Sequence, residues 1–165
     1  MQPSINEEVN RRRAWFDDYF ERSLQGGDAD LPKRYFCCPC CGYPTLPERG
    51  GHDICELCNW EDDGQDDPQA DEVRGGPNGS YSLAQARENF HTYGVMYSPE
   101  NDMRLIGGDT DAEWAAKQGL IRAFETMRSG TGDALGSLQA EIASCRRILQ
   151  AEMIKKVRGF ARITD

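Results

Sequence analysis

The sequence lacks any long apolar run. No stretch approaches the ~18 consecutive apolar residues of a membrane-spanning helix. The opening residues, MQPSINEEVNRRR, lack the apolar core of a signal peptide. We therefore expect a cytoplasmic protein. Thiols stay reduced in that compartment, so the odd number of seven cysteines predicts metal ligands and free thiols rather than disulfides.

Basic residues are also scarce. The 165 residues include 28 acids against 19 bases, which gives a net charge of -9. A protein that binds DNA or RNA usually needs a basic face to neutralise phosphates, so this charge argues against nucleic-acid binding. An acidic protein is instead attracted to basic partners, although negative charge also simply keeps a protein soluble.

No group of residues predicts catalysis. An enzyme needs a nucleophile, a base or an open metal position within mutual reach, and the sequence offers no such set. The glycine-rich stretch at 74–79 lacks the Lys-Ser/Thr pair of a phosphate-binding loop. His91 has no partner thiol or carboxylate pattern beside it. We therefore predict a binding protein and not an enzyme.

The sequence does contain a dense cysteine cluster. Six of the seven cysteines lie between Cys37 and Cys58, and two Cys-x-x-Cys pairs there are separated by thirteen residues. Four thiolates in two such pairs form the usual tetrahedral structural zinc site. Gly42, directly after the first pair, can adopt the positive φ that closes the turn. The predicted zinc ligands are Cys38, Cys41, Cys55 and Cys58.

Other assignments of the same cluster remain open. Cys37 and Cys40 form an overlapping Cys-x-x-Cys pair, which could be a redox dithiol or an alternative pair of ligands. His52 could replace one thiolate. A redox pair normally lies where a strand leads into a helix, and no such pattern surrounds this one, so we favour the metal. Cys145 lies far from the cluster at a helical core spacing and is expected to be an inert buried thiol.

Three motifs in this region resemble a known family. The string CPCCGYPTL is followed by DICELCNWEDDGQDD and then by GGPNGSYSLAQARENFHTYG. In this order the motifs resemble the bacterial cysteine-rich CPCC family, over about residues 35–95 only. The resemblance implies a small zinc-ribbon-like module. Members are similar to small proteins encoded near interbacterial toxins, so it also implies an immunity role.

An acidic segment follows the second cysteine pair. Seven carboxylates and no base lie between Glu61 and Glu72, with a spacing that does not match a calcium loop. Runs of charge are usually solvated loops, and the functional alternative is an electrostatic docking surface. Trp60 either docks with this surface or shields the sulfurs. The predicted partner-binding residues are Trp60, Glu61, Asp62, Asp63, Asp66 and Asp67.

Local signals predict four helices. Capping boxes lie at residues 4–7, 82–85 and 110–113, and a last helix should run from about Asp133 to Arg158. Gly26-Gly27 should end the first helix. Arg11, Arg12 and Arg13 point around that helix, so we interpret them as solvated. The inward face of the third helix is predicted to comprise Trp114, Leu120, Ile121, Phe124 and Met127.

The last helix carries two further features. An apolar seam predicts packing against the preceding helix, with homodimerisation as the alternative; it comprises Leu135, Leu138, Ile142, Cys145 and Leu149. Six bases toward its C-terminal end oppose the helix dipole, an interpretation that we prefer to nucleic-acid binding; they are Arg146, Arg147, Lys155, Lys156, Arg158 and Arg162.

Together these signals predict an α+β fold, in which a small zinc ribbon with a short β-hairpin sheet packs among three to four α-helices. An N-terminal helix (1–30), a CPCC zinc-ribbon module (31–97) and a C-terminal helical hairpin (98–165) should form one compact domain. The leading functional hypothesis is a zinc-stabilised immunity protein that neutralises a cognate toxin, such as a basic nuclease. The alternatives are a regulatory or adaptor protein associated with nucleic acid, and a dithiol redox protein using Cys37 and Cys40.

Overall fold

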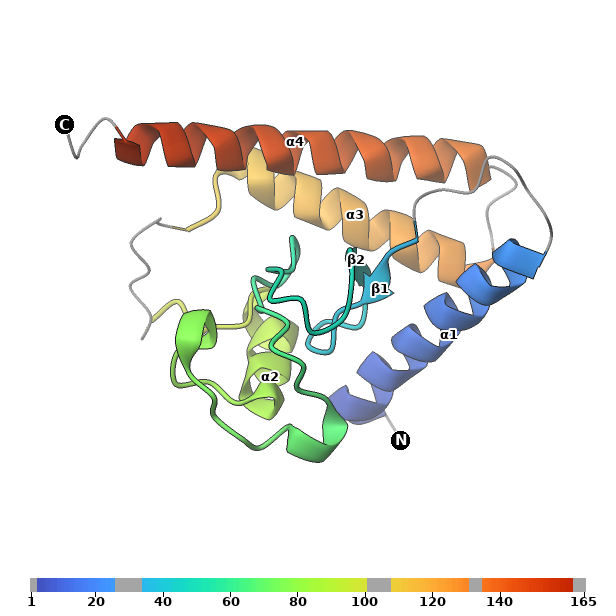
Figure 1. Cartoon of the computed structure of the whole chain (residues 1–165). Helices are drawn as coiled ribbons and strands as arrows, with labels where there is room; N and C mark the ends of the chain where they lie inside the picture. Colours follow the sequence, from blue (N-terminus) through green and yellow to red (C-terminus); the bar gives the residue numbers. More distant parts are fainter. Residues whose placement is uncertain (1–2, 26–33, 101–107, 131–134, 162–165) are drawn as a thin grey trace. The chain divides into compact units, whose positions relative to one another are not determined.

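The computed structural model describes residues 3–25, 34–100, 108–130 and 135–161. These residues form four α-helices, one two-stranded sheet and two short 3-10 helices (Figure 1). The predicted α+β class is confirmed. None of the helices in these ranges combines the length and the hydropathy needed to cross a membrane. The chain divides into two compact units, Met1–Asp102 and Met103–Asp165, and packing as one domain stays a prediction.

The first unit begins with helix α1, Ile5–Gln25. Its capping box forms as predicted, because the Ser4 amide donates to the Glu7 carboxylate at 2.7 Å and the Glu7 amide donates to the Ser4 hydroxyl at 3.3 Å. Val9 and Phe16 are buried on its inner face. The predicted stop at Gly26-Gly27 lies outside the described residues.

The two cysteine pairs are each held by a short antiparallel hairpin. Strand β1 (Phe36–Cys37) pairs with β2 (Pro44–Leu46), with Phe36 opposite Leu46. An isolated bridge between Ile54 and Glu61 closes the second hairpin. Cys38 and Cys41 lie between β1 and β2, and Cys55 and Cys58 lie between the two bridge residues. Each pair therefore occupies the tip of its own hairpin.

A long connection joins the second hairpin to helix α2. It contains two 3-10 helices, η1 (Asp67–Gln69) and η2 (Gly76–Asn78). Helix α2 then runs from Leu83 to Tyr93, opened by the predicted Ser82 capping box and ended by Gly94 in the left-handed conformation. Its buried side chains include Arg87, whose burial no local sequence pattern indicates.

The second unit consists of two helices that lie side by side (Figure 1). Helix α3 (Asp111–Ser129) begins at the predicted Thr110 cap and ends at Gly130, and α4 runs from Leu135 to Ala161. A Cβ atom added at Gly119 of α3 would lie 2.7 Å from the Cys145 sulfur, so glycine permits a close approach there. Cys145 is buried, as expected. The start predicted near Asp133 lies outside the described residues.

The predicted inward face of α3 is partly wrong. Leu120 and Phe124 are buried, but Trp114 is exposed. Two charged residues of α3 are buried in its place. Glu113 forms an ion pair with Lys156 at 2.6 Å, and Lys117 forms one with Asp109 at 2.9 Å. Hydropathy alone could not predict this exchange, because each buried charge is compensated by a specific partner.

Candidate metal centre

The four predicted ligands converge in one buried cluster. The sulfur atoms of Cys38, Cys41, Cys55 and Cys58 all lie within 4.8 Å of one another, and none of the four residues is exposed. The Cys38 and Cys58 sulfurs are 3.6 Å apart, and those of Cys41 and Cys55 are 3.7 Å apart. These distances are too long for a disulfide of about 2.05 Å. Four sulfurs in a tetrahedron around zinc, each about 2.3 Å from the ion, are about 3.8 Å apart.

Two equivalent turns present these sulfurs. We name them the first knuckle, Cys38–Tyr43, and the second knuckle, Cys55–Trp60. In the first, the Gly42 amide donates to the Cys38 carbonyl at 2.9 Å and the Cys38 amide donates to the Tyr43 carbonyl at 2.9 Å. In the second, the Asn59 amide donates to the Cys55 carbonyl at 3.0 Å and the Cys55 amide donates to the Trp60 carbonyl at 2.8 Å.

The residue after each second cysteine has a positive φ. Gly42 has a φ of 79° and Asn59 a φ of 66°. The role predicted for Gly42 is therefore confirmed, whereas that of Asn59 was missed. Asparagine is among the few non-glycine residues that tolerate this conformation, and this preference was the signal that could have revealed the symmetry of the knuckles.

Polar groups around Cys55 stabilise charge on its sulfur. The backbone amides of Leu57 and Cys58 donate to it at 3.4 and 3.5 Å. The Thr45 hydroxyl lies 3.0 Å from the same sulfur. Thr45 was not among the predicted site residues, because its position next to Cys55 depends on the pairing of β1 with β2. Hydrogen bonds to thiolate sulfur favour the charged form that a metal requires.

The cluster cannot carry four negative charges without a cation. Burial raises the pKa of Cys38 to about 11 and raises the pKa values of Cys41 and Cys58 well above that of an ordinary thiol. Burial opposes ionisation of Cys55 too, but hydrogen bonds from the three other cysteines outweigh it and hold its pKa well below the usual value. A divalent cation at the centre would supply the charge that four buried thiolates need.

Comparison with known proteins agrees with this geometry. Residues 36–105 match the model of a family described as Cysteine-rich CPCC. Over this segment the chain is therefore similar to the cysteine-rich CPCC family. No curated protein matches the chain in sequence, and no solved structure matches it in fold. The CPCC segment contains all four clustered cysteines, whereas α1 and almost all of the second unit lie outside it.

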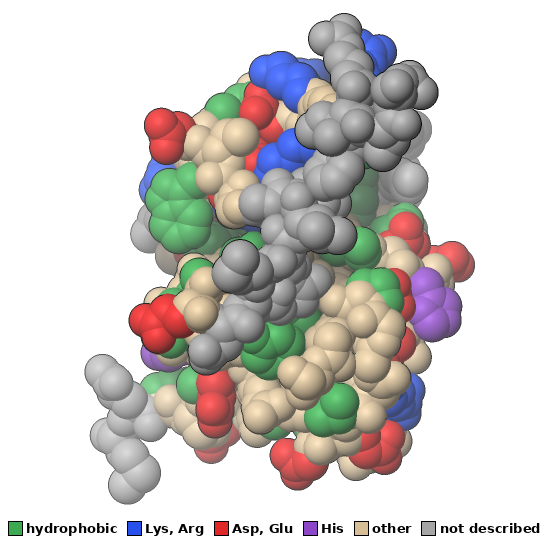
Figure 2. Space-filling view, turned by 90° about the vertical axis from the view of Figure 1, so that its left-hand side faces the viewer, with side chains coloured by type: hydrophobic (Ala, Val, Ile, Leu, Met, Phe, Trp, Pro, Cys, Tyr) green, Lys and Arg blue, Asp and Glu red, His purple; other side chains and the backbone are tan. Residues whose placement is uncertain are grey.

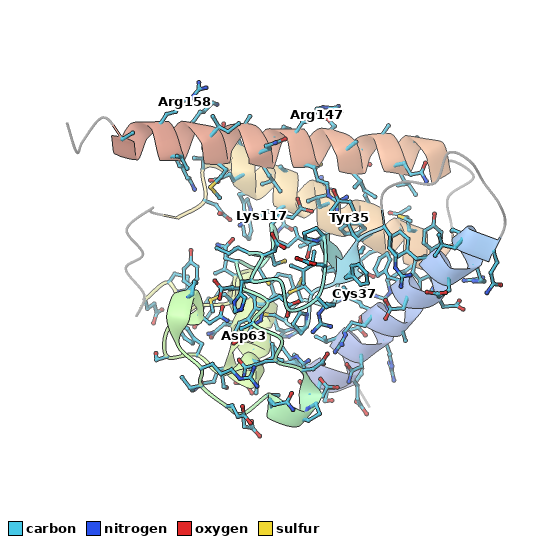
Figure 3. The ribbon with its side chains drawn as sticks, in the orientation of Figure 1. Tyr35, Cys37, Asp63, Lys117, Arg147 and Arg158 are labelled. Atoms are coloured by element: carbon cyan, nitrogen blue, oxygen red, sulfur yellow. The ribbon has the colours of Figure 1, made fainter. Side chains whose placement is uncertain are left out.

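Two of the alternative ligands, Cys37 and His52, lie outside the four-sulfur cluster. The Cys37 sulfur is 3.9 Å from the Arg13 carbonyl and from an Asp17 carboxylate oxygen, between β1 and α1 (Figure 3). Burial and the Asp17 charge raise the pKa of Cys37 to about 12, the opposite of what a reactive dithiol requires. His52 is exposed, and its Nδ1 lies 3.1 Å from the Glu61 carboxylate and not in the cluster.

The acidic residues of the CPCC segment are largely engaged inside the first unit. Asp62 is fully buried and accepts hydrogen bonds from the Arg49 side chain at 2.9 Å and from the Gly50 amide at 2.7 Å. Asp66 accepts two hydrogen bonds from Arg13, each of 2.7 Å. Burial would raise the pKa of Asp66, but the Arg13 hydrogen bonds outweigh it and hold that pKa well below its usual range.

These contacts correct the predicted docking surface. Trp60 and Asp62 have no exposed surface and cannot contact a partner directly. Asp67 is partly exposed, but it also binds Arg87 at 2.7 Å. On the face shown in Figure 2, acidic side chains are scattered among uncharged ones and do not form one patch. Of the predicted set, only Glu61, Asp63, Asp66 and Asp67 reach the surface.

The arginines of α1 also differ from prediction. Arg11 is exposed, as expected for a solvated residue. Arg12 instead donates to the carbonyl of the ligand Cys41 at 2.9 Å, and Arg13 binds Asp66 as described above. The interpretation of Arg12 and Arg13 as solvated is therefore wrong. Their partners lie 29 and 53 residues away in the sequence, so no local pattern could reveal them.

Proposed function

We propose that the four cysteines bind one zinc ion and that this ion holds the CPCC segment in its folded form. The observation that supports the proposal is the buried set of four sulfurs within 4.8 Å of one another. Four thiolates fill the tetrahedral shell of zinc and leave no position for water or substrate, so the ion's role is structural. The chain is then a binding protein and not an enzyme.

Metal removal tests this role. Zinc-finger-like sites bind zinc with an apparent free energy of about 10–16 kcal/mol, and this binding energy contributes directly to folding. We expect a strong chelator to abolish the dispersed amide signals of residues 34–100 in an NMR spectrum, and added Zn²⁺ to restore them. Cobalt(II) in place of zinc should give the absorption bands of a tetrahedral thiolate site. An unchanged spectrum in metal-free protein would contradict the proposal.

We further propose that this cytoplasmic protein neutralises a basic protein toxin. The resemblance of the CPCC segment to immunity-type proteins supports this role, and so does the distribution of charge. Residues 1–102 carry 20 acids against 9 bases, whereas residues 103–165 carry 8 acids against 10 bases. A basic partner would be attracted to the first unit, with an association rate that falls as salt rises.

Purification from native cells tests the partner. The tagged chain should be recovered at low salt with one basic protein in equal amount, and high salt should release it. The released protein should be toxic or enzymatically active, and adding the chain back should inhibit it. Recovery of the chain alone, or with RNA, would contradict the immunity role and favour a regulatory one.

A further inference from the structure

Large apolar residues are exposed along helix α4. Four large apolar residues of this helix have between 41% and 60% of their surface exposed: Ile148, Met153, Ile154 and Val157. Such residues normally lie inside, and a group of them on one helix indicates a contact surface. Helix α4 buries Cys145 and Leu149 in the same stretch, so its inner face is already formed.

The spacing separates the two faces. Cys145 and Leu149 are four residues apart and share the side of α4 that approaches Gly119 of α3. Arg147, Ile154 and Arg158 are spaced by seven and four residues, so they form a second stripe along the helix. Arg147 and Arg158 both point away from α3 (Figure 3). Val157 lies three residues beyond Ile154 on the same side. We call the exposed residues Arg147, Ile154, Val157 and Arg158 the outer stripe.

The outer stripe is basic and contains no acid. Between Ile142 and Ala161 the only acid is Glu152, against five bases. Its carboxylate is only 13% exposed and is bound by the Thr110 hydroxyl and by Lys155. Lys156 turns inward to Glu113. Among the residues that the structure describes, Arg147 and Arg158 make no ion pair, so their charges are available to a partner.

We propose that the outer stripe binds an acidic amphipathic segment of another protein, such as a helix with apolar residues in a row and Asp or Glu beside them. Apolar groups of such a helix would cover Ile154 and Val157, and its carboxylates would pair with Arg147 and Arg158. This interaction is independent of the metal centre and of any toxin.

Charge argues against a second copy of the chain, a membrane or a nucleic acid as the ligand of the outer stripe. Two copies of the outer stripe would repel each other, because the stripe carries only positive charge. A membrane or a nucleic acid is an extended polyanion, so the net charge of -9 of the chain disfavours its binding more than that of a short segment. Phosphates would also leave the exposed Ile154 and Val157 without apolar contacts. A short acidic protein segment avoids both problems.

A labelled model peptide tests the proposal on the full chain. The probe is a fluorescent amphipathic helix of about 18 residues, or five turns, with leucines in one row and glutamates beside them. We expect fluorescence anisotropy to show binding that weakens about tenfold or more in Arg147→Glu/Arg158→Glu. Replacing Ile154 and Val157 by serine should weaken binding severalfold, as should replacing the leucines of the peptide.

A matched variant controls for net charge. Arg11 and Arg22 are exposed arginines of α1, and changing both to glutamate alters the net charge by the same amount. Binding to Arg11→Glu/Arg22→Glu should stay within about twofold of the unmodified chain, because salt screens exposed charges that do not contact the peptide. Circular dichroism should show that every variant keeps its helix content. Equal loss in both charge variants would overturn the proposal.

Two further measurements test whether the outer stripe binds a membrane, a nucleic acid or a second copy of the chain. Vesicles containing one-third phosphatidylglycerol and a short DNA duplex should bind less tightly than the peptide. Tighter binding to either one, lost in Arg147→Glu/Arg158→Glu, would overturn the assignment to a protein. Light scattering should show one molecular mass at all concentrations. A mass that rises with concentration, and does not rise in Arg147→Glu/Arg158→Glu, would assign the stripe to a second copy.

Discussion

Gly42 is the single residue on which the first knuckle depends most. Its positive φ closes the turn after Cys41, and the space beside it is occupied by α1. A Cβ atom at this position would lie 2.9 Å from the carbonyl oxygen of Val9 and 3.2 Å from Cβ of Arg12. The sequence revealed the turn, because glycine after a cysteine pair is a local signal. It could not reveal the close approach to a helix more than thirty residues earlier.

Replacing Gly42 by alanine should therefore be costly. We expect a loss of about 2–4 kcal/mol in the free energy of unfolding, from the strained φ and from the contact with Val9 together. Gly50 is the matched control, because its φ is 67° but its nearest neighbour would be at 3.7 Å, an ordinary contact. Gly50→Ala should cost about 1 kcal/mol. Equal losses in urea denaturation would show that the helix contact is unimportant.

His52 provides a test of the ion pairs around the CPCC segment. The hydrogen bond that His52 Nδ1 donates to the Glu61 carboxylate raises the pKa of His52 above its ordinary value. A histidine with a raised pKa stabilises the fold below its unfolded pKa of about 6.5, and this contribution is lost as the pH rises through the higher folded value.

An NMR titration measures the pKa of His52 directly. The pKa of the His52 ring should lie above that of an ordinary histidine, and Glu61→Gln should lower it toward the ordinary value. A His52 pKa that does not change in Glu61→Gln would mean that the pair does not form in solution.

Among the elements, α1 has the most unexpected role. It precedes the CPCC segment, yet it contributes bonds to Cys41 and Asp66 and buries Phe16 against the aromatic ring of Tyr43, with ring centres 6.4 Å apart. The helix itself was predictable from its capping box, which depends on neighbouring residues. Its attachment to the metal module was not, because that depends on contacts distant in sequence.

Truncating Phe16 should consequently destabilise the metal module. Phe16→Ala should cost about 3–5 kcal/mol and speed the transfer of zinc to a chelator, because a fully buried ring is lost beside the first knuckle. Leu24, half exposed near the end of the same helix, is the control. Leu24→Ala should change stability by less than about 0.5 kcal/mol and leave zinc transfer unchanged. Similar zinc transfer in both variants would show that α1 does not support the metal module.

In the other helices too, features set by neighbouring residues were predictable and features set by residues distant in sequence were not. The starts of α2 and α3 were predicted correctly, because a capping box is complete within four residues. The burial of Arg87 was missed, since its guanidinium binds the Pro39 carbonyl at 2.9 Å and the Asn6 side chain at 3.0 Å, both far away in the sequence. Trp114 was placed inside on hydropathy alone and is exposed.

In the whole molecule, charge and metal are distributed unequally between the two units. The first unit contains all four clustered cysteines and most of the acids, and the second contains the basic outer stripe. Composition revealed the net charge of -9 but not this division, which depends on where the units separate. The ligand set was predictable, because the spacing of the cysteine pairs is a strong local motif. The hydrogen bonds that arginines donate to the acidic segment were not predictable, because they join residues distant in sequence.

The most direct test asks whether these four cysteines hold one zinc ion. Native mass spectrometry of the chain and of its single Cys→Ser variants measures the zinc content directly. We predict one zinc per chain in the unmodified protein and in Cys37→Ser, Cys40→Ser and Cys145→Ser. Loss or marked weakening of zinc binding is predicted for Cys38→Ser, Cys41→Ser, Cys55→Ser and Cys58→Ser. A chain purified without metal and nevertheless folded, or one that loses zinc in Cys37→Ser or Cys40→Ser instead, would contradict the account.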